Sequence, residues 1–182
     1  MTRQLRPALL LSALLSLVLT AGAAAAGEGH GTDLFAGYSF AQIQDSNRNG
    51  ANLALGFDLV GPLSGFVDTS LHWGSQEGVS LSDLTLMAGP GLRFGTRGGT
   101  VFFVRALAGL VQDKASIDVL DVDISETSSS FGVLFGGGVD FSVASSLAVR
   151  VQGDYLWNDV DEGESSGYRV SAGIVYRFGS AR

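Results

Sequence analysis

The stretch 168–178, YRVSAGIVYRF, alternates between two kinds of side chain along its whole length. One face carries only apolar and aromatic residues, and the other carries small or charged residues that include Arg169 and Arg177. Side chains of a β-strand point to opposite faces with a period of two. The alternation therefore predicts a strand with one fully apolar face. Aromatic residues near both ends of that face are typical of a strand that crosses a membrane.

Seven earlier segments repeat this alternation, and the connections between them are alternately long and short. The segments cover residues 33–43, 51–60, 65–74, 84–94, 100–112, 129–142 and 147–157. Strands of about ten residues match a bilayer, and an even strand count with short turns at one end is typical of outer-membrane barrels. The pattern predicts an all-β fold, an eight-stranded antiparallel up-and-down transmembrane β-barrel with its apolar faces toward lipid. Pro90 lies inside the fourth segment and predicts a β-bulge there.

The N-terminus has the pattern of a secretory signal peptide. Arg3 and Arg6 precede an apolar stretch, which ends in small residues suited to cleavage near Ala26. We expect residues 1–26 to form the signal peptide and residues 27–182 to form one outer-membrane barrel domain. The alternative is a transmembrane anchor, which the alanine-rich end and the missing basic flank disfavour. The chain has no cysteine, so neither a lipoprotein anchor nor a disulfide is available.

The mature chain is expected to be strongly acidic. Without Arg3 and Arg6 it has 9 basic against 18 acidic residues, a formal charge of −9. This charge argues against nucleic acid as a partner, because phosphate backbones bind basic surfaces. No later apolar run is long enough for a transmembrane helix. Together with the export signal, the pattern predicts that the protein lies in the bacterial outer membrane.

Charged residues fall on the predicted inward faces of the strands. An eight-stranded barrel is only wide enough for its own side chains to fill it, and an unpaired buried charge costs several kcal/mol. We therefore expect a paired interior network made of Asp58, Asp68, His72, Arg93, Arg105, Asp140, Arg150, Asp154, Arg169 and Arg177. The alternative is a narrow ion path or gate, which the small lumen disfavours.

His72 is the residue that most suggests catalysis. It alternates with Leu71 and Trp73, which are expected to face lipid, so its side chain should face the interior. No nucleophile and orienting acid are visible beside it in the sequence, and we interpret it as a hydrogen-bonded interior histidine.

Residues 136–138 are three glycines, expected to permit curvature or close packing of a strand. The sequence predicts no catalytic, metal or cofactor site, with a lipid A-modifying enzyme or a small channel as the alternatives.

The predicted strand ends share a short motif, since Gly91-Leu-Arg-Phe is similar to Tyr176-Arg-Phe. With the strand pattern over about 33–178, the chain resembles the small eight-stranded outer-membrane barrel family typified by the OmpA transmembrane domain and OmpX. The resemblance implies that Tyr176 and Phe178 form an assembly signal read by the barrel-assembly machinery. It also implies contact with membrane lipid and lipopolysaccharide. Here Gly-Ser-Ala-Arg follows Phe178, whereas the family usually ends on the aromatic residue.

Two long connections hold most of the remaining acidic residues. The last one carries Asp159, Asp161, Glu162 and Glu164, interpreted as a solvated surface rather than a divalent-cation site, because it lacks the calcium-loop motif. The longest, 113–128, keeps alternating through Ile117, Asp118, Val119, Asp121, Val122, Asp123 and Ile124. This predicts a hairpin above the membrane that turns near Leu120-Asp121, and that either binds a surface protein by strand addition or only stiffens the rim. The predicted function is therefore envelope structure or adhesion-type surface interaction.

Overall fold

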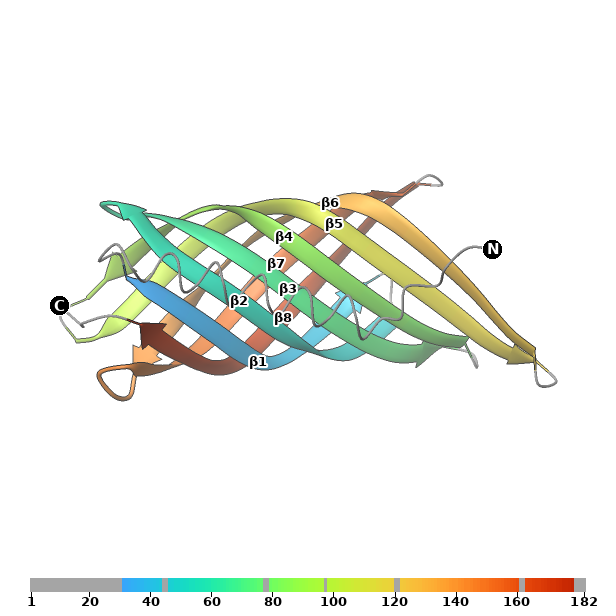
Figure 1. Cartoon of the computed structure of the whole chain (residues 1–182), viewed down its shortest axis with the longest axis horizontal. Coiled ribbons are helices and arrows are strands. Elements are labelled where there is room, and N and C mark those ends of the chain that lie inside the picture. Colours follow the sequence, from blue (N-terminus) through green and yellow to red (C-terminus); the bar gives the residue numbers. More distant parts are fainter. Residues whose placement is uncertain are drawn as a thin grey trace.

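The chain folds into eight β-strands in a computed structural model that describes residues 31–43, 46–76, 79–96, 98–119, 122–160 and 163–178. Side chains are described over the same residues except 75–76, 79–80, 115–119, 122–127, 159–160 and 163–164. The strands are β1 (Thr32–Ile43), β2 (Ser46–Val60), β3 (Leu63–Gln76), β4 (Val79–Gly95), β5 (Thr100–Val119), β6 (Val122–Ser142), β7 (Leu147–Val160) and β8 (Gly163–Phe178). Each strand pairs antiparallel with the next one along the chain (Figure 1).

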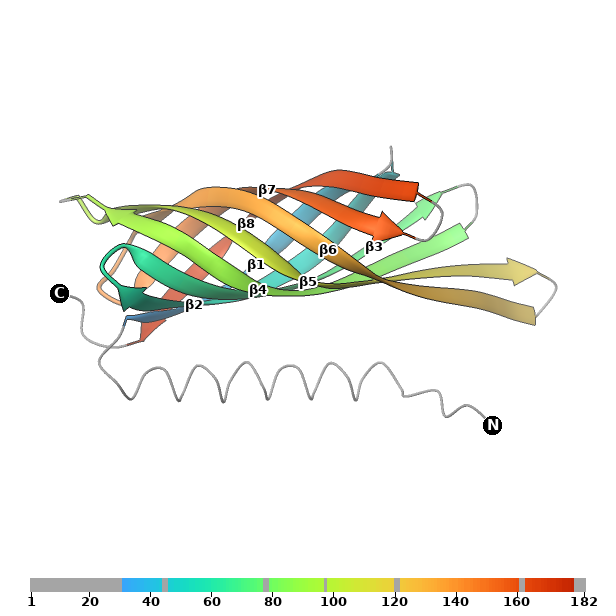
Figure 2. The ribbon, with the colours of Figure 1, turned by 90° about the horizontal axis from the view of Figure 1, so that it is seen from above.

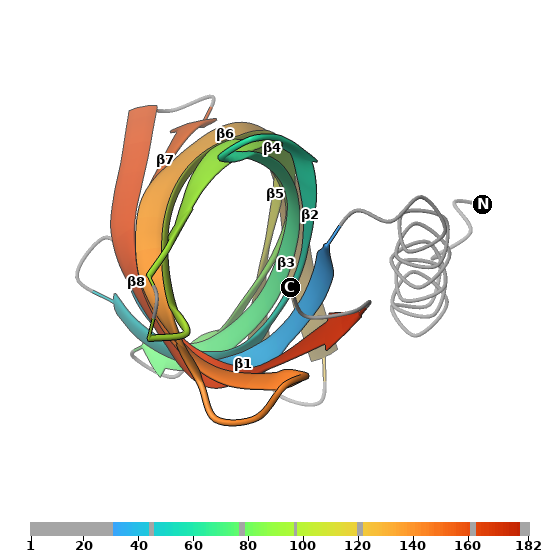
Figure 3. The ribbon, with the colours of Figure 1, turned by 90° about the vertical axis from the view of Figure 1, so that its left-hand side faces the viewer.

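The first and last strands close the sheet into a barrel. β1 pairs antiparallel with β8, from Thr32 opposite Phe178 to Ile43 opposite Gly167. Figure 3 shows the resulting ring of strands from the end where β1 begins and β8 ends. We call this the termini end, and the opposite end, with the β1–β2, β3–β4, β5–β6 and β7–β8 connections, the hairpin end. The predicted eight-stranded antiparallel barrel is confirmed.

The strands extend further toward the hairpin end than the sequence segments did. β5 has 20 residues and β6 has 21, whereas β1 has 12. The predicted loops at 44–50, 113–128 and 158–167 are therefore mostly strand, because backbone pairing continues wherever two neighbouring strands remain adjacent. The predicted β5–β6 hairpin is confirmed, with Ile117 opposite Ile124 and Val119 opposite Val122, and it projects beyond the other strands (Figure 2). The turn residues, Leu120 and Asp121, lie outside the described residues.

The bulge predicted at Pro90 is wrong. The flanking pairs of β4 with β5, Ala88 opposite Ala108 and Gly91 opposite Arg105, belong to one unbroken register. Proline has no N–H to donate, so it interrupts the pairing locally without inserting a residue. The register shift in this part of the barrel lies instead at the end of β2, beside the turn into β3.

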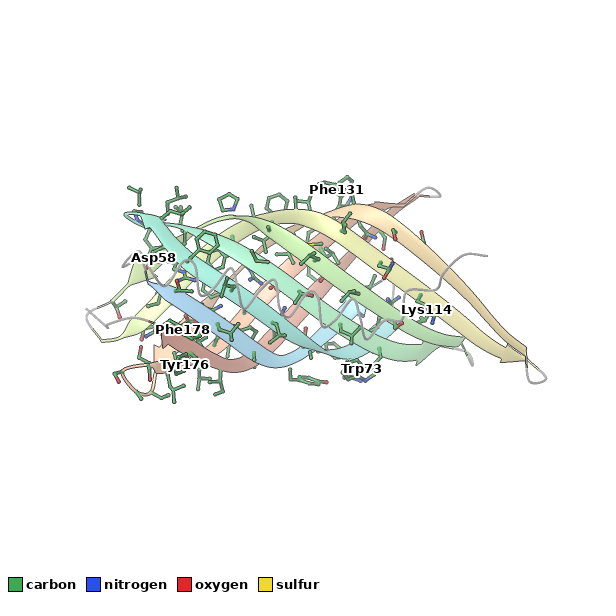
Figure 4. All side chains as sticks on the ribbon, in the orientation of Figure 1. Asp58, Trp73, Lys114, Phe131, Tyr176 and Phe178 are labelled. Atoms are coloured by element: carbon green, nitrogen blue, oxygen red, sulfur yellow. The ribbon has the colours of Figure 1, made fainter. Side chains whose placement is uncertain are left out.

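The outward face is apolar along the barrel wall, as the alternation predicted. Figure 4 places Trp73 and Phe131 toward the hairpin end and Tyr176 and Phe178 at the termini end, all of them on the outside. Aromatic rings near the two ends of an apolar belt suit the two interfaces of a bilayer. No helix in the described part of the chain is long and apolar enough to span a membrane.

The interior is more apolar than the sequence predicted. One inward cluster joins six buried residues from β3 to β6, namely Phe66, Met87, Phe103, Leu107, Val111 and Leu134. A second joins Phe35, Ala54, Ala148 and Val175 near the termini end. The predicted network of charged residues therefore accounts for only part of the interior. The two apolar clusters fill part of the lumen, and the charged groups share the rest.

Candidate functional site

The termini end of the lumen holds a line of side chains that alternate in charge. In order, they are Asp58, Arg93, Asp33, Arg150, Asp140 and Arg177. Arg150 is central, because its Nε donates to Asp140 Oδ1 at 2.6 Å and its Nη2 donates to Asp33 Oδ1 at 3.2 Å. Arg177 lies at the outer end, with its Nη2 3.8 Å from Asp140 Oδ2. Three carboxylates and three guanidinium groups thus balance within one layer.

A second group of charges forms a closed ring in the middle of the barrel. Arg169 Nη1 lies 2.9 Å from Asp68 Oδ1, and its Nη2 lies 2.8 Å from Asp154 Oδ2. Arg105 Nη2 lies 3.0 Å from both Asp68 Oδ2 and Asp154 Oδ1. Each arginine therefore bridges both carboxylates, and β3, β5, β7 and β8 are joined across the lumen. Asn52 adds a hydrogen bond from its Nδ2 to Asp68 Oδ1 at 3.0 Å.

Aromatic rings separate the two charged layers. Phe66 and Phe103 stack with their centroids 5.7 Å apart. The guanidinium carbon of Arg93 lies 4.7 Å from the centroid of Phe66, and that of Arg150 lies 4.6 Å from the centroid of Phe103. Cations over ring faces gain cation–π stabilisation, which is stronger in a desolvated site. The arginines are therefore held by rings as well as by carboxylates.

Glycines on the wall make room for these side chains. A Cβ added at Gly136 would lie 2.0 Å from Asp154 Oδ1, and one at Gly138 would lie 2.8 Å from Phe103 Cζ. Both positions face inward, so the close packing expected of the 136–138 glycines is present at these two positions. The interior network depends on this missing volume, because Asp154 would otherwise be pushed out of the central ring.

All ten residues of the predicted interior network form ion pairs with other interior side chains, but the prediction missed four charged residues that also join these pairs. Asp33 joins the line at the termini end, while Arg48, Asp83 and Asp113 form a third group at the hairpin end with His72. Arg48 Nη1 lies 2.7 Å from Asp83 Oδ1 and 3.6 Å from Asp113 Oδ1. The alternation could have placed them inside, since each missed residue lies an even number of positions from inward-facing residues of the same strand.

His72 belongs to a serine–histidine–aspartate arrangement that the sequence did not predict. Its Nε2 shares a hydrogen bond with Ser39 Oγ at 2.9 Å, and its Nδ1 shares one with Asp83 Oδ2 at 3.0 Å. Ser171 Oγ donates to Ser39 Oγ at 3.0 Å. The three members come from β1, β3 and β4, so only the strand register brings them together. The earlier expectation that no such constellation forms is corrected.

Geometry at the serine decides what this arrangement does chemically. Ser39 is completely buried, at 0% exposure. A narrow cavity reaches His72 and Asp83 from the side of Leu156 and Tyr168, but its lining does not include Ser39. A nucleophilic serine needs a reacting carbonyl about 3 Å away, together with donors for the developing oxyanion. The arrangement therefore joins β1, β3 and β4 at the hairpin end of the lumen, with its serine buried and outside the lining of this cavity.

The predicted surface residues lie at the tips of the hairpins. Six of the seven hairpin residues are paired in β5 or β6, and Asp121 lies outside the described residues. In the last connection Asp159 pairs with Glu164, while Asp161 and Glu162 are also outside the described part. Within the described ranges, no three histidine, cysteine or acidic side chains gather as a metal site. The rings of Tyr176 and Phe178 pack edge to face at 4.8 Å on the outer wall.

The barrel is similar in fold to solved outer-membrane proteins. Neisserial surface protein A is 18% identical, with 82% of this chain and 97% of that chain covered and a TM-score of 0.60. Ail, the attachment invasion locus protein of Yersinia pestis, was solved with the heparin analogue sucrose octasulfate. It is 18% identical, with 82% of this chain and 99% of that chain covered and a TM-score of 0.60. A major outer membrane protein from Thermus thermophilus is 14% identical, with 83% of this chain and 100% of that chain covered and a TM-score of 0.55.

At these identities the likeness to solved structures is one of fold. No curated protein sequence matches the chain. A family model for the outer membrane protein beta-barrel domain matches residues 11–178, which include all eight strands. Together with the closed barrel and its apolar outer wall, this match locates the protein in the bacterial outer membrane. The chain belongs to the outer membrane protein beta-barrel domain family.

Proposed function

We propose that this chain is a non-enzymatic outer-membrane protein whose filled barrel presents the β5–β6 hairpin to a partner outside the cell. The observation that carries the proposal is the length of the hairpin, whose strands have 20 and 21 residues and project beyond the rest of the barrel (Figure 2). Barrels of this kind keep short turns in the periplasm and longer segments outside. The hairpin end is accordingly the extracellular end in this proposal.

The non-enzymatic part of the proposal is supported by the interior. Ser39 has the partners of a catalytic serine, yet it is buried against Ser171 and His72. The role of the arrangement is then to tie β1, β3 and β4 together at the hairpin end. A lipid A-modifying enzyme would need its nucleophile within reach of an ester, and a channel would need a lumen free of side chains.

The wall of the barrel meets lipid in this proposal, and its assembly uses the last strand. Exposed aromatic residues such as Trp73 at the hairpin end suit contact with membrane lipid and lipopolysaccharide. Tyr176 and Phe178 are the residues that we expect the barrel-assembly machinery to read. The signal peptide, residues 1–26, lies outside the described residues and remains a prediction.

The proposal is tested by shortening the hairpin. Ser116 pairs with Ser125, so an Asn-Gly turn in place of residues 117–124 closes the ladder at an existing pair. We expect the shortened protein to fold, because no membrane-level pair is removed, and cells carrying it to lose at least tenfold in binding to neighbouring bacteria, host cells or matrix-coated surfaces. Heat-modifiable gel mobility and cell-binding assays measure the two results.

The matched control changes only the turn, with Leu120→Asn and Asp121→Gly, and keeps the full hairpin. It should bind surfaces as the unmodified protein does. If the shortened protein retained every surface interaction of this control, the interaction role would be wrong. A purely structural role in the envelope would then be the better account.

A further inference from the structure

The three charged groups of the lumen differ in their charge balance. The line at the termini end pairs three carboxylates with three guanidinium groups, and the central ring pairs two with two. The group at the hairpin end has two carboxylates, Asp83 and Asp113, but only the guanidinium of Arg48 among the described side chains. His72 is the fourth member of this group. The hairpin-end group is therefore balanced only when the group holds one additional proton.

One guanidinium nitrogen serves both carboxylates of this group. Arg48 Nη1 lies 2.7 Å from Asp83 Oδ1 and 3.6 Å from Asp113 Oδ1. The shorter contact is a hydrogen bond, whereas the longer one is beyond hydrogen-bond distance. Asp83 and Asp113 lie opposite each other in the register of β4 with β5. A small movement of the Arg48 side chain would therefore exchange one ion pair for the other.

The hydrogen bonds of His72 suit both a neutral and a charged ring. Its Nδ1 lies 3.0 Å from Asp83 Oδ2, the carboxylate oxygen that Arg48 does not contact. A carboxylate can only accept, so Nδ1 carries a hydrogen, and the Nε2 of a neutral ring then accepts from the hydroxyl of Ser39. In an imidazolium both nitrogens donate, and Ser39 can turn its own hydroxyl toward Ser171 Oγ, 3.0 Å away. His72 therefore keeps both of its hydrogen bonds in either charge state.

The other strands present neutral or compensated side chains to His72. The narrow cavity beside it is lined by Arg169 of β8, whose charge the two carboxylates of the central ring balance. β6 and β7 contribute the apolar side chains of Leu134 and Leu156 to this lining, and β1 contributes the hydroxyl of Ser39 to His72 itself. Among the described side chains of the lumen, the uncompensated charges near His72 are those of Asp83, Arg48 and Asp113.

We propose that His72 is a proton-operated switch that decides which carboxylate Arg48 holds. Neutral His72 leaves Asp83 to Arg48, as in the structure. A proton taken from solvent turns the ring into an imidazolium, which becomes the cation of Asp83, and Arg48 then pairs with Asp113. Because Asp113 lies at the base of the β5–β6 hairpin, acidification ties this base to β2. Histidine ordinarily changes its charge between about pH 5 and pH 8, so mild acidification operates the switch. The switch is independent of whether the hairpin binds a partner.

Asp113 is the competing acceptor of the proton. Burial and the charge of Asp83 raise the pKa of the Asp113 carboxyl above its ordinary value, although Arg48 acts in the opposite direction. A proton on Asp113 would also balance the group, but it would remove the charge with which Arg48 is to pair. The two acceptors therefore predict opposite results. A protonated His72 strengthens the contact of Arg48 with Asp113, and a protonated Asp113 abolishes it.

The first measurement is nitrogen-15 NMR of the imidazole in the folded barrel in lipid nanodiscs, between about pH 8 and about pH 5. His30 is the other histidine of the chain, so His30→Gln leaves His72 as the single imidazole signal. We expect the neutral ring with its hydrogen on Nδ1 at the higher pH and the imidazolium at the lower pH. The carbon-13 signal of the Asp113 carboxyl should keep its ionised position throughout. A ring that stays neutral, or an Asp113 that is protonated before His72, would overturn the proposal.

The second measurement is hydrogen exchange of the β5 amides around Asp113 at the same two pH values, corrected for the intrinsic chemical rate. Acidification should raise their protection about threefold, because the pair of Arg48 with Asp113 then holds β5 to β2. His72→Gln is the matched variant, since an amide can keep the hydrogen bonds to Ser39 and Asp83 but cannot gain a charge. Its protection should not respond to pH. An equal response in His72→Gln and the unmodified barrel would show that His72 is not the switch.

Two further variants separate the exchange of partners from a general effect of acid. Asp113→Asn keeps the shape of the side chain and removes the second carboxylate, so His72 should still take up a proton while the protection of β5 no longer responds. Asp159→Asn removes an acidic group from the β7–β8 hairpin and should leave both measurements as they are in the unmodified barrel. A pH response retained in Asp113→Asn would contradict the exchange of partners. The imidazole spectrum needs only His30→Gln, so it tests the switch even if His72→Gln folds poorly.

Discussion

Replacing Arg150 by methionine is expected to lower the free energy of unfolding by about 3–5 kcal/mol, the usual cost of breaking a buried ion pair by removing one partner. Arg150 is fully buried and donates two hydrogen bonds to Asp140 and one to Asp33. Without it, the nearest remaining cation for Asp140 is Arg177, 3.8 Å away. Urea unfolding of the purified barrel in lipid vesicles, followed by tryptophan fluorescence, measures the change.

Arg177→Met is the matched control for this result. The Arg177 side chain is 27% exposed and lies at the end of the same line of charges, so its loss should cost less than about 1 kcal/mol. Adding Asp140→Asn to Arg150→Met should recover part of the lost stability, because the stranded carboxylate is then neutral. Equal effects of Arg150→Met and Arg177→Met would contradict the view that Arg150 is the centre of a buried network.

A second large effect is expected at a glycine rather than at a charged residue. Gly136→Val places a side chain where Asp154 now lies, with the first added carbon 2.0 Å from Asp154 Oδ1. Asp154 must then leave the central ring, which strands Arg105 and Arg169 and should cost about 3–5 kcal/mol. The same urea titration, together with the fraction of heat-modifiable folded protein, reports the loss.

The control for this substitution lies on the neighbouring strand. Gly153 has nothing within 4 Å of an added Cβ and lies on the outward face. Gly153→Val should therefore fold normally and keep its stability within about 0.5 kcal/mol, as surface substitutions usually do. If Gly153→Val and Gly136→Val were equally harmful, loss of strand flexibility rather than loss of interior volume would explain the effect of Gly136→Val.

The fold was predictable because its alternation is local and regular. In 168–178 every second residue is apolar, and a period of two assigns each side chain to lipid or lumen without knowledge of the partner strands. The same rule would have placed Asp33 inside, since it has the opposite parity to Leu34. The alternation was less informative at Phe102-Phe103-Val104, because three consecutive apolar residues do not show which of them faces inward.

The groups at the hairpin end were predictable only in part. Arg48, Asp83 and Asp113 were assigned to connections, because polar residues near a strand end do not reveal that pairing continues. The contact of Ser39 with His72 depends on the registers between β1, β2 and β3, which no single segment encodes. The sequence therefore predicts which face of a strand each side chain occupies, whereas the contacts between side chains of different strands follow from the register of the folded barrel.

The central claim is that side chains fill this barrel and make it a scaffold for its surface hairpin rather than a pore. The most direct test is single-channel recording of the folded, purified chain in planar bilayers. We expect no stepwise conductance, because two layers of paired charges and the Phe66–Phe103 stack occupy the lumen. A stable, reproducible conductance that changes in Arg169→Met would contradict the claim, since ions would then be passing through the central ring.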